Sequence, residues 1–417
     1  MSLHKREKVC IEVMAPAGSF ESLRAAIQGG ADSVYFGIGE LNMRSHSANN
    51  FSEEELKEIV AICSEAGVKT YLTLNIVLYD QELSSMRRVV DAAKEAGVSA
   101  IIASDMAAIM YAVEQGVKVH ISTQLNISNI ESVRYYSHFA DVMVLARELT
   151  LHQVKSIYEV IARERITGPS GELVQIELFC HGALCMAISG KCYLSLHEYN
   201  ASANRGSCYQ LCRRGYEVTD IETGSSLEID NRYIMSPKDL STIAFVDKMI
   251  DSGAQIFKIE GRARSPEYVK TVTMAYREAI DAVCNGTYTP ELVAGLEKEL
   301  ASVFNRGFWD GYYQGARLGE WSSVYGNSAT RRKEYTGKVT NFFTELSVAE
   351  ILIESGVLKI GDEILIIGPT TGVVEHIVDE IRVDLEPVEE TVKGETCSIP
   401  IPEGIKLRRS DKVYLWC

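Results

Sequence analysis

Between Val9 and Ala282 the chain repeats one pattern, an amphipathic helix that ends in glycine and is followed at once by a short apolar run. The copies read IQGGADSVYFG, SEAGVKTYLTL, KEAGVSAIIAS, VEQGVKVHIST and DSGAQIFKIEG. A glycine in this position suits the left-handed conformation that closes a helix, and the apolar run suits a buried parallel strand. The repeat therefore predicts alternating strands and helices, an α/β fold.

Counting these runs gives eight strands, the number that a closed (β/α)8 barrel requires. They are expected at Val9–Met14, Ser33–Phe36, Val68–Leu74, Ala100–Ala103, Val117–Ser122, Val142–Leu145, Leu173–Leu178 and Gln255–Ile259. About 75 residues separate the last two, and within them YEVTDIETGSSLEIDNRYIM has the texture of a hairpin. An open, doubly wound sheet is the alternative architecture.

The pattern changes near the C-terminus, where short alternating strands are separated by glycine turns. We expect a TIM-barrel-like catalytic domain over residues 1–320 with a cysteine-rich insertion at 177–241, then a linker at about Glu320–Lys333. A small β-barrel domain is expected over residues 334–417. Its segment VLKIGDEILIIGP resembles the second domain of translation elongation factors, which favours an RNA partner.

Five of the ten cysteines lie between Glu177 and Arg214. The chain has no apolar run long enough for a signal peptide or a membrane span, so we expect a cytoplasmic protein without a membrane partner. Thiols stay reduced in that compartment, which disfavours a disulfide framework and favours metal binding or catalysis.

Soft sulfur ligands select zinc or an iron-sulfur cluster. Zinc sites usually contain C-x2-C or C-x4-C pairs, and here only Cys180 and Cys185 have such a spacing. Iron-sulfur ligation is looser in spacing, so we favour a cluster, with zinc as the alternative. Buried structural thiols remain a third interpretation, because free cysteine is often buried.

Polar residues follow several of the predicted strands, at the end where barrel enzymes place their functional groups. Lys258 lies at the end of the last predicted strand, Glu260 and Arg262 follow it, and His181 follows the seventh. Glu260 and His181 are the first candidates for a general base. The remaining possibility for each is a structural role as a helix cap or an ion-pair partner.

Arginines flank the last two cysteines of the stretch, among them Arg205 and Arg213. With Lys258 and Arg262 they predict an anion subsite for a carboxylate or a nucleic-acid phosphate, although a solvated charge run is equally compatible. The net charge of -15 and the pI of about 5.1 restrict any nucleic-acid contact to a local patch. No H-E-x-x-H, G-x-S-x-G or phosphate-loop motif supports a peptidase or a nucleotide hydrolase.

Several longer motifs carry a resemblance to a known family. They are APAG at 15–18, GADSVYFG at 30–37, ELFCHGALC at 177–185, NRGSC at 204–208, SPKDL at 236–240 and FKIEGR at 257–262. On these motifs the chain resembles peptidase family U32, the collagenase-like proteases, over most of its length. Family members include proteins required for 5-hydroxyuridine at the tRNA wobble position with prephenate, and others that carry 4Fe-4S clusters.

The resemblance implies that Cys185, Cys192 and Cys208 are cluster ligands. Relatives often have cysteine where this chain has Ser241, so Cys212 is the expected fourth ligand. The implied function is a tRNA-modifying protein that supports 5-hydroxylation of the wobble uridine, with tRNA and a small carboxylate donor such as prephenate as partners. The alternatives are a U32-type peptidase and a non-catalytic RNA-binding factor.

Overall fold

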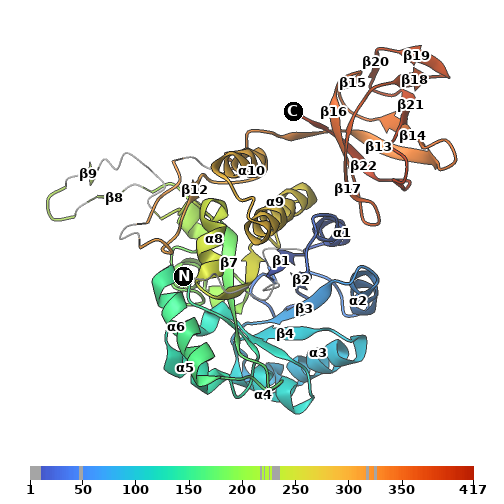
Figure 1. The fold of residues 1–417 in the computed structure, drawn as a ribbon. Coiled ribbons are helices and arrows are strands. Elements are labelled where there is room, and N and C mark those ends of the chain that lie inside the picture. Colours follow the sequence, from blue (N-terminus) through green and yellow to red (C-terminus); the bar gives the residue numbers. More distant parts are fainter. Residues whose placement is uncertain are drawn as a thin grey trace.

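A computed structural model describes residues 11–46, 50–216, 218–219, 221–224, 226–227, 235–315, 319–323 and 326–417. Eight parallel strands form its centre (Figure 1). In the order in which they pair they are β1 (Glu12–Pro16), β2 (Ser33–Phe36), β3 (Lys69–Leu74), β4 (Ala100–Ala103), β5 (Val119–Ile121), β6 (Val142–Val144), β7 (Gln175–Ala183) and β11 (Ala254–Ile259). Because β11 pairs with both β1 and β7, the sheet is a closed barrel, and the open-sheet alternative is wrong.

Helices cover the outside of the barrel (Figure 1). They are α1 (Phe20–Gln28), α2 (Leu56–Glu65), α3 (Leu83–Ala96), α4 (Met106–Glu114), α5 (Ile130–Tyr136), α6 (Leu151–Glu164), α8 (Val246–Asp251), α9 (Pro266–Asn285) and α10 (Pro290–Ser302). The glycines predicted to close a helix all have positive φ: Gly30, Gly67, Gly97, Gly116 and Gly253. The helix-Gly-strand repeat is therefore confirmed as the unit from which the barrel is built.

Alternation along the strands divides their side chains between two cores. Tyr35, Tyr71 and Ile102 belong to a small cluster inside the barrel, together with Met14 and Ile256. Outward-facing residues join the large cluster between strands and helices. This division leaves room inside the upper barrel for polar side chains at the strand ends.

The seventh strand is longer than predicted. It continues to Ala183, and its last three residues pair in antiparallel register with β10 (Asp239–Ser241). Cys180 and His181 therefore lie within a strand instead of following it, which corrects the expected end at Leu178. No local sequence pattern marks this extension, because the pairing partner lies about 60 residues further along the chain.

The insertion between β7 and β11 contains α7 (Leu194–Tyr199) and the short 3-10 helices η3 (Ala203–Arg205) and η4 (Leu211–Arg213). The predicted hairpin is confirmed in its described part, where β8 (Val218–Thr219) pairs with β9 (Ser226–Leu227). Much of the hairpin lies outside the described residues, as does Cys10. Strand β12 (Phe308–Trp309) pairs with β10 and ties the segment after α10 to the insertion.

The C-terminal domain is an antiparallel sheet of eight strands around a core of its own. Its strands, including a separate pair formed by β15 and β20, are β13 (Lys333–Phe343), β14 (Val348–Ile353), β15 (Val357–Lys359), β16 (Glu363–Gly368), β17 (Gly372–Ile377), β18 (Ile381–Val383), β19 (Glu386–Val388), β20 (Glu390–Val392), β21 (Thr396–Pro400) and β22 (Lys412–Trp416). Among the described residues no pairing joins the edge strands β17 and β19, so hydrogen bonds do not close the predicted barrel there.

The C-terminal domain packs against helices α1 and α9 of the barrel. Gln28 donates to the carbonyl of Thr371 at 2.9 Å and accepts from the amide of Val373 at 2.9 Å. Lys270 pairs with Glu375 at 2.9 Å. In the part of the chain that is described, no helix is long and apolar enough to cross a membrane.

Candidate functional site

A cavity of about 210 Å³ opens where the barrel strands end. Its lower wall consists of side chains from six strands, namely Tyr35, Thr73, Ile102, Val144, Phe179 and Lys258. The upper wall is contributed by the βα loops and by the cysteine-rich insertion. This is the end of the barrel at which enzymes of this fold bind their substrates.

Lys258 is fixed from below by a buried ion pair. Its Nζ lies 2.7 Å from Oε1 of Glu177, which is fully buried, and 4.6 Å from the ring centroid of Tyr35. The second carboxylate oxygen of Glu177 lies 3.6 Å from Nδ1 of His120. Burial opposes ionisation of Glu177, but Lys258 and His120 outweigh it and hold the pKa of Glu177 below its ordinary value.

Glu260 and Arg44 form the second ion pair of the cavity, 2.7 Å apart. Burial opposes ionisation of Glu260, yet Arg44 and Arg264 outweigh burial and keep the pKa of this carboxyl below its ordinary value. A carboxylate held in this way is a weak base, so Glu260 is better suited to orienting Arg44 than to accepting a proton.

Arg262 is buried beside this pair and has no carboxylate within ion-pair distance among the described residues. It donates to Oδ1 of Asn42 at 2.9 Å and to Oγ1 of Thr73 at 3.1 Å. Burial lowers the pKa of Arg262 to about 10, so the guanidinium remains charged at neutral pH. A Cβ added at Gly37 would lie 2.2 Å from Nη1 of Arg262, so only glycine leaves room for this side chain.

Two further arginines connect the insertion to the barrel. Arg213 donates to the carbonyls of Leu184, at 2.7 Å, and of Pro237. Arg147 donates to Oγ of Ser189 at 2.9 Å and lies 5.5 Å from the ring centroid of Phe179. Neither arginine has a carboxylate partner within 4.0 Å in the described parts of the chain.

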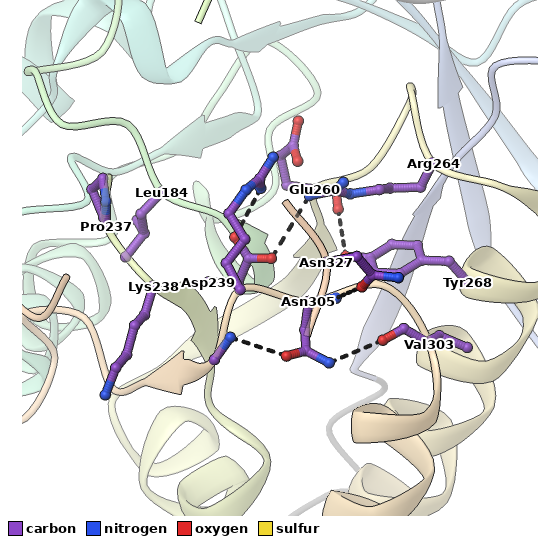
Figure 2. Close-up of polar contacts among 12 residues, drawn as sticks. Leu184, Pro237, Lys238, Asp239, Glu260, Arg264, Tyr268, Val303, Asn305 and Asn327 are labelled. Carbon is purple, nitrogen blue, oxygen red and sulfur yellow. Dashed lines mark hydrogen bonds and ion pairs between the residues drawn. The ribbon is translucent and has the colours of Figure 1, made fainter. Parts of the chain in front are cut away.

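Asp239 is buried beside Arg264 and Arg306, two further cations of the cavity (Figure 2). It lies 3.3 Å from Nη1 of Arg306 and 3.7 Å from Nη2 of Arg264, which reaches toward it in Figure 2. Burial raises the pKa of Asp239 above its ordinary value although both arginines oppose this. Asn305 holds the loop that carries Arg306, since it donates to the carbonyl of Val303 at 3.0 Å and accepts from the amide of Gly307 at 3.0 Å.

The cavity is strongly cationic although the whole chain is acidic. The described lining contains seven cationic side chains and one carboxylate, Glu260. Glu177 and Asp239 add two carboxylates that pair with lining cations from behind, so the cations still outnumber the carboxylates by four. The cations are Arg44, Arg147, Arg213, Lys258, Arg262, Arg264 and Arg306. Holding unpaired cations in a partly buried space is costly unless an anion binds there. The arrangement is therefore suited to a negatively charged ligand.

Four cysteines of the insertion line the same cavity: Cys185, Cys192, Cys208 and Cys212. The pKa of Cys212 is raised to about 11, chiefly by burial; Arg213 opposes this rise, and Cys185, Cys208 and Cys192 add to it. The pKa of Cys192 is likewise raised by burial, with smaller effects from Cys185 and Cys208. Cys185, Cys192, Cys208 and Cys212 thus share one cavity.

Four thiols are a donor set of the kind that binds either zinc or an iron-sulfur cluster. A single zinc ion needs its sulfur ligands about 2.3 Å from one point. No three His, Cys, Asp or Glu side chains in the described ranges are placed so that they could hold a metal ion. In an iron-sulfur cluster each cysteine binds a different iron, so the ligands stand further apart. The thiols fit the chemistry of that group.

His181 and Cys180 face away from the cavity. His181 packs among Tyr268, Tyr276 and Phe308 on the outside of the barrel, and burial lowers its pKa to about 3. Cys180 is fully buried, and burial raises the pKa of its thiol well above the ordinary value. The expectation that His181 lies at the barrel mouth is wrong, because the strand continues past it, and a general-base role for His181 finds no support.

Arg205 also lies outside the cavity lining. Its guanidinium is bound by both oxygens of Glu82, at 2.6 and 2.9 Å, and by the carbonyl of Val77 at 2.9 Å. It lies 3.8 Å from the ring centroid of Tyr79. Arg205 therefore ties the insertion to the loop after β3, and its predicted anion-binding role finds no support.

Arg44, Arg147 and Arg306 line the cavity but were not among the residues predicted for the anion subsite. Arg44 and Arg147 follow predicted strands, so their position was a usable signal, but nothing in the sequence distinguished them from helix caps. Arg306 lies in the aromatic segment RGFWDG, far from any barrel strand in sequence. Only the pairing of β12 with β10 brings Arg306 to the cavity.

Comparison with known proteins identifies the relatives of this chain. The sequence model of peptidase family U32 matches residues 18–323. The chain belongs to peptidase family U32. It is 62% identical to a protein named collagenase from Porphyromonas gingivalis, over 97% of each chain.

Other members of family U32 are named for RNA modification. The chain is 33% identical to tRNA hydroxylation protein P1 of Bacillus subtilis, over 89% of this chain and 86% of that protein. It is 34% identical to the 23S rRNA 5-hydroxycytidine C2501 synthase of Escherichia coli, over 74% of this chain and 46% of that protein. The family thus includes proteins named as a protease and proteins named for RNA hydroxylation, and chemistry has to distinguish the two for this chain.

The described lining of the cavity differs from that of a thiol or serine peptidase. Such enzymes use a base, commonly histidine, beside the nucleophile, and no histidine is among the described lining residues. Its lining carboxylate, Glu260, is held by Arg44. An acidic residue pair for peptide hydrolysis is therefore also missing from the described lining.

Proposed function

We propose that this protein is a cytoplasmic tRNA-modifying enzyme that supports 5-hydroxylation of the wobble uridine. The observation that carries the proposal is the cavity at the barrel mouth, where an excess of cations meets four thiols and no histidine. The names of the B. subtilis and E. coli relatives support an RNA substrate. A small carboxylate donor such as prephenate fits the charge of the cavity.

In this proposal Arg262 and Arg147 bind the donor's carboxylates. Both guanidiniums lack an ion-pair partner among the described residues, and the neutral groups that they contact, Asn42 and Ser189, orient them without neutralising them. Glu260 fixes the direction of Arg44, and Glu177 does the same for Lys258. The cavity is thereby arranged for the anion before it binds, which reduces the cost of ordering the site.

Cys185, Cys192, Cys208 and Cys212 would hold a 4Fe-4S cluster, which when bound supplies electron transfer beside the donor. Ser241, where the family resemblance implies a cysteine in many relatives, pairs with His181 in the sheet and bonds to Tyr276. It is not among the residues that line the cavity. These contacts support Cys212 as the fourth ligand.

Anaerobic purification tests the cluster. The wild-type protein should contain iron and sulfide near the stoichiometry of one 4Fe-4S cluster, with broad visible absorption. Cys192→Ser should lose most of both, whereas Cys284→Ser, an exposed thiol on α9, should keep them. Equal iron in the two variants would contradict the ligand assignment, and stoichiometric zinc in the wild type would favour the zinc alternative.

A peptidase is the second candidate, and the 62% identity to the P. gingivalis collagenase favours it. It predicts cleavage of denatured collagen by pure protein, with loss of that activity in a cavity variant such as Arg262→Met. Iron-free protein that cleaves peptides at a rate sensitive to this variant would replace the hydroxylation proposal.

A further inference from the structure

The insertion carries a group of large side chains that the cavity does not use. They are Met186, Ile188, Tyr193, Tyr199 and Tyr209, which are exposed by 45, 53, 74, 47 and 54%. Single exposed hydrophobic residues are common, but these five, here called the patch, come from one short insertion, and the rings of Tyr199 and Tyr209 are in contact. Exposed aromatic rings at this density point to a partner that stacks on them.

The patch borders the cavity directly. Tyr193 follows Cys192 in the chain, and Tyr209 follows Cys208, so each cysteine lines the cavity while the next residue is exposed to solvent. Met186 stands in the same relation to Cys185. A ligand on the patch would therefore be within one residue of the cavity wall.

Two of the rings, those of Tyr199 and Tyr209, are held in place by contacts within the insertion. Tyr199 and Tyr209 meet edge to face, with centroids 5.3 Å apart and planes at 68°. The amide of Tyr209 donates to Oγ of Ser195 at 3.0 Å, which fixes it to the start of α7. Nη2 of Arg214 donates to the hydroxyl of Tyr199 at 3.0 Å. A ring that is already ordered loses little entropy when a ligand stacks on it.

Charge at the patch favours an anionic partner. Arg214 and Lys191 are exposed and form no ion pair among the described residues, although the exposed carboxylate of Glu198 belongs to the same insertion. The seven cations of the cavity adjoin the same surface. Exposed rings interleaved with cations are the pattern of single-stranded nucleic-acid sites, because bases stack on the rings and phosphates meet the cations.

We infer that Tyr193, Tyr199 and Tyr209, here called the tyrosine rim, stack the unpaired bases of an RNA loop and present the neighbouring nucleotide to the cavity. The inference rests on the proposed function, since it assumes an RNA substrate. It adds that recognition requires unpaired nucleotides, because bases in a duplex are already stacked and cannot cover the rim.

Fluorescence anisotropy with the full-length protein tests the rim. Two labelled RNAs are compared, a hairpin with an unpaired anticodon-type loop and a blunt duplex of the same stem. Tyr193→Leu and Tyr209→Leu should each weaken hairpin binding at least about fivefold, because leucine keeps apolar surface but cannot stack. Tyr193→Phe should bind within about twofold of wild type, because phenylalanine keeps the stacking ring.

Tyr135→Leu is the matched control. Tyr135 is also a tyrosine and 56% exposed, but it lies near the C-terminal end of α5, away from the end of the barrel where the cavity opens. This variant should bind the hairpin as the wild type does, and circular dichroism should show all variants folded. Hairpin binding by Tyr193→Leu/Tyr209→Leu at wild-type affinity would overturn the inference, as would equal affinity of the wild type for duplex and hairpin.

Cellular nucleoside analysis separates failure of the rim from failure of the function. If the strain with Tyr193→Leu/Tyr209→Leu keeps normal 5-hydroxyuridine while a deletion strain loses it, the rim inference fails and the proposed function stands. If the deletion strain is unchanged and the pure protein binds a collagen peptide through the same tyrosines, both fail.

Discussion

Replacement of Glu177 by glutamine should strongly destabilise the barrel. Glu177 is fully buried, and it is the carboxylate within ion-pair distance of Lys258 in the described structure, at 2.7 Å. Glutamine preserves the shape of the side chain but removes its charge, so the ammonium of Lys258 remains in the barrel without compensation. Breaking a buried pair in this way typically costs about 3–5 kcal/mol of unfolding free energy.

Urea denaturation followed by far-ultraviolet circular dichroism measures this loss. The α-helices described in the structure all belong to the barrel domain, so the helical signal reports its unfolding. The midpoint for Glu177→Gln should fall by roughly 1 M urea or more. Glu164→Gln, which removes an exposed pair with Arg134, is the matched control and should leave the midpoint unchanged.

A double variant distinguishes charge imbalance from lost packing. Glu177→Leu/Lys258→Met removes both charges and should recover most of the stability lost in the single variant, because apolar replacements of a buried pair are often neutral or stabilising. The reasoning would be refuted by a Glu177→Gln protein as stable as the wild type. A double variant no more stable than the single one would show that packing is responsible instead.

Three shorter predictions concern the insertion and the buried histidine. Gly206→Ala should loosen the insertion, since the added Cβ would lie 2.0 Å from Oγ of Ser45 at a φ of +83°, and faster limited proteolysis would reveal it. Arg205→Lys should raise the rate of limited proteolysis within the insertion about fivefold, because lysine cannot bind both carboxylate oxygens of Glu82 as arginine does. An unchanged rate would contradict the role of Arg205 in tying the insertion to the loop after β3. The pKa of His181 is about 3 in the folded protein and about 6.5 in the unfolded chain, so between pH 3 and pH 6.5 the unfolded state binds one proton more than the folded state. Wild-type stability should therefore fall by up to about 1.4 kcal/mol per pH unit below pH 6.5 relative to His181→Gln, and parallel pH profiles would contradict this.

The barrel was predictable because its signals are local. Each glycine that closes a helix, such as Gly97, stands directly before its strand, and the register follows from alternation along the chain. The end of β7 was misplaced because His181 and Ala183 pair with a strand that enters from the far side of the insertion. No local pattern marks that partner.

The candidate site was likewise predictable where its signals are local in the sequence and not where they depend on long-range packing. The four cavity cysteines could be identified from one stretch of sequence, since family motifs surround them. Arg205 and Arg213 occupy similar positions beside this stretch, yet Glu82 binds the first while the second reaches the cavity. Charge and spacing do not distinguish them, because the difference depends on which loop packs beside each arginine.

Mass spectrometry of tRNA nucleosides tests the central claim most directly. A deletion strain is complemented with the wild type, with Cys192→Ser or with Cys284→Ser, and each protein is checked for equal accumulation. The account predicts loss of 5-hydroxyuridine on deletion, restoration by the wild type and by Cys284→Ser, and no restoration by Cys192→Ser. Unchanged 5-hydroxyuridine in the deletion strain, or full restoration by Cys192→Ser, would contradict it.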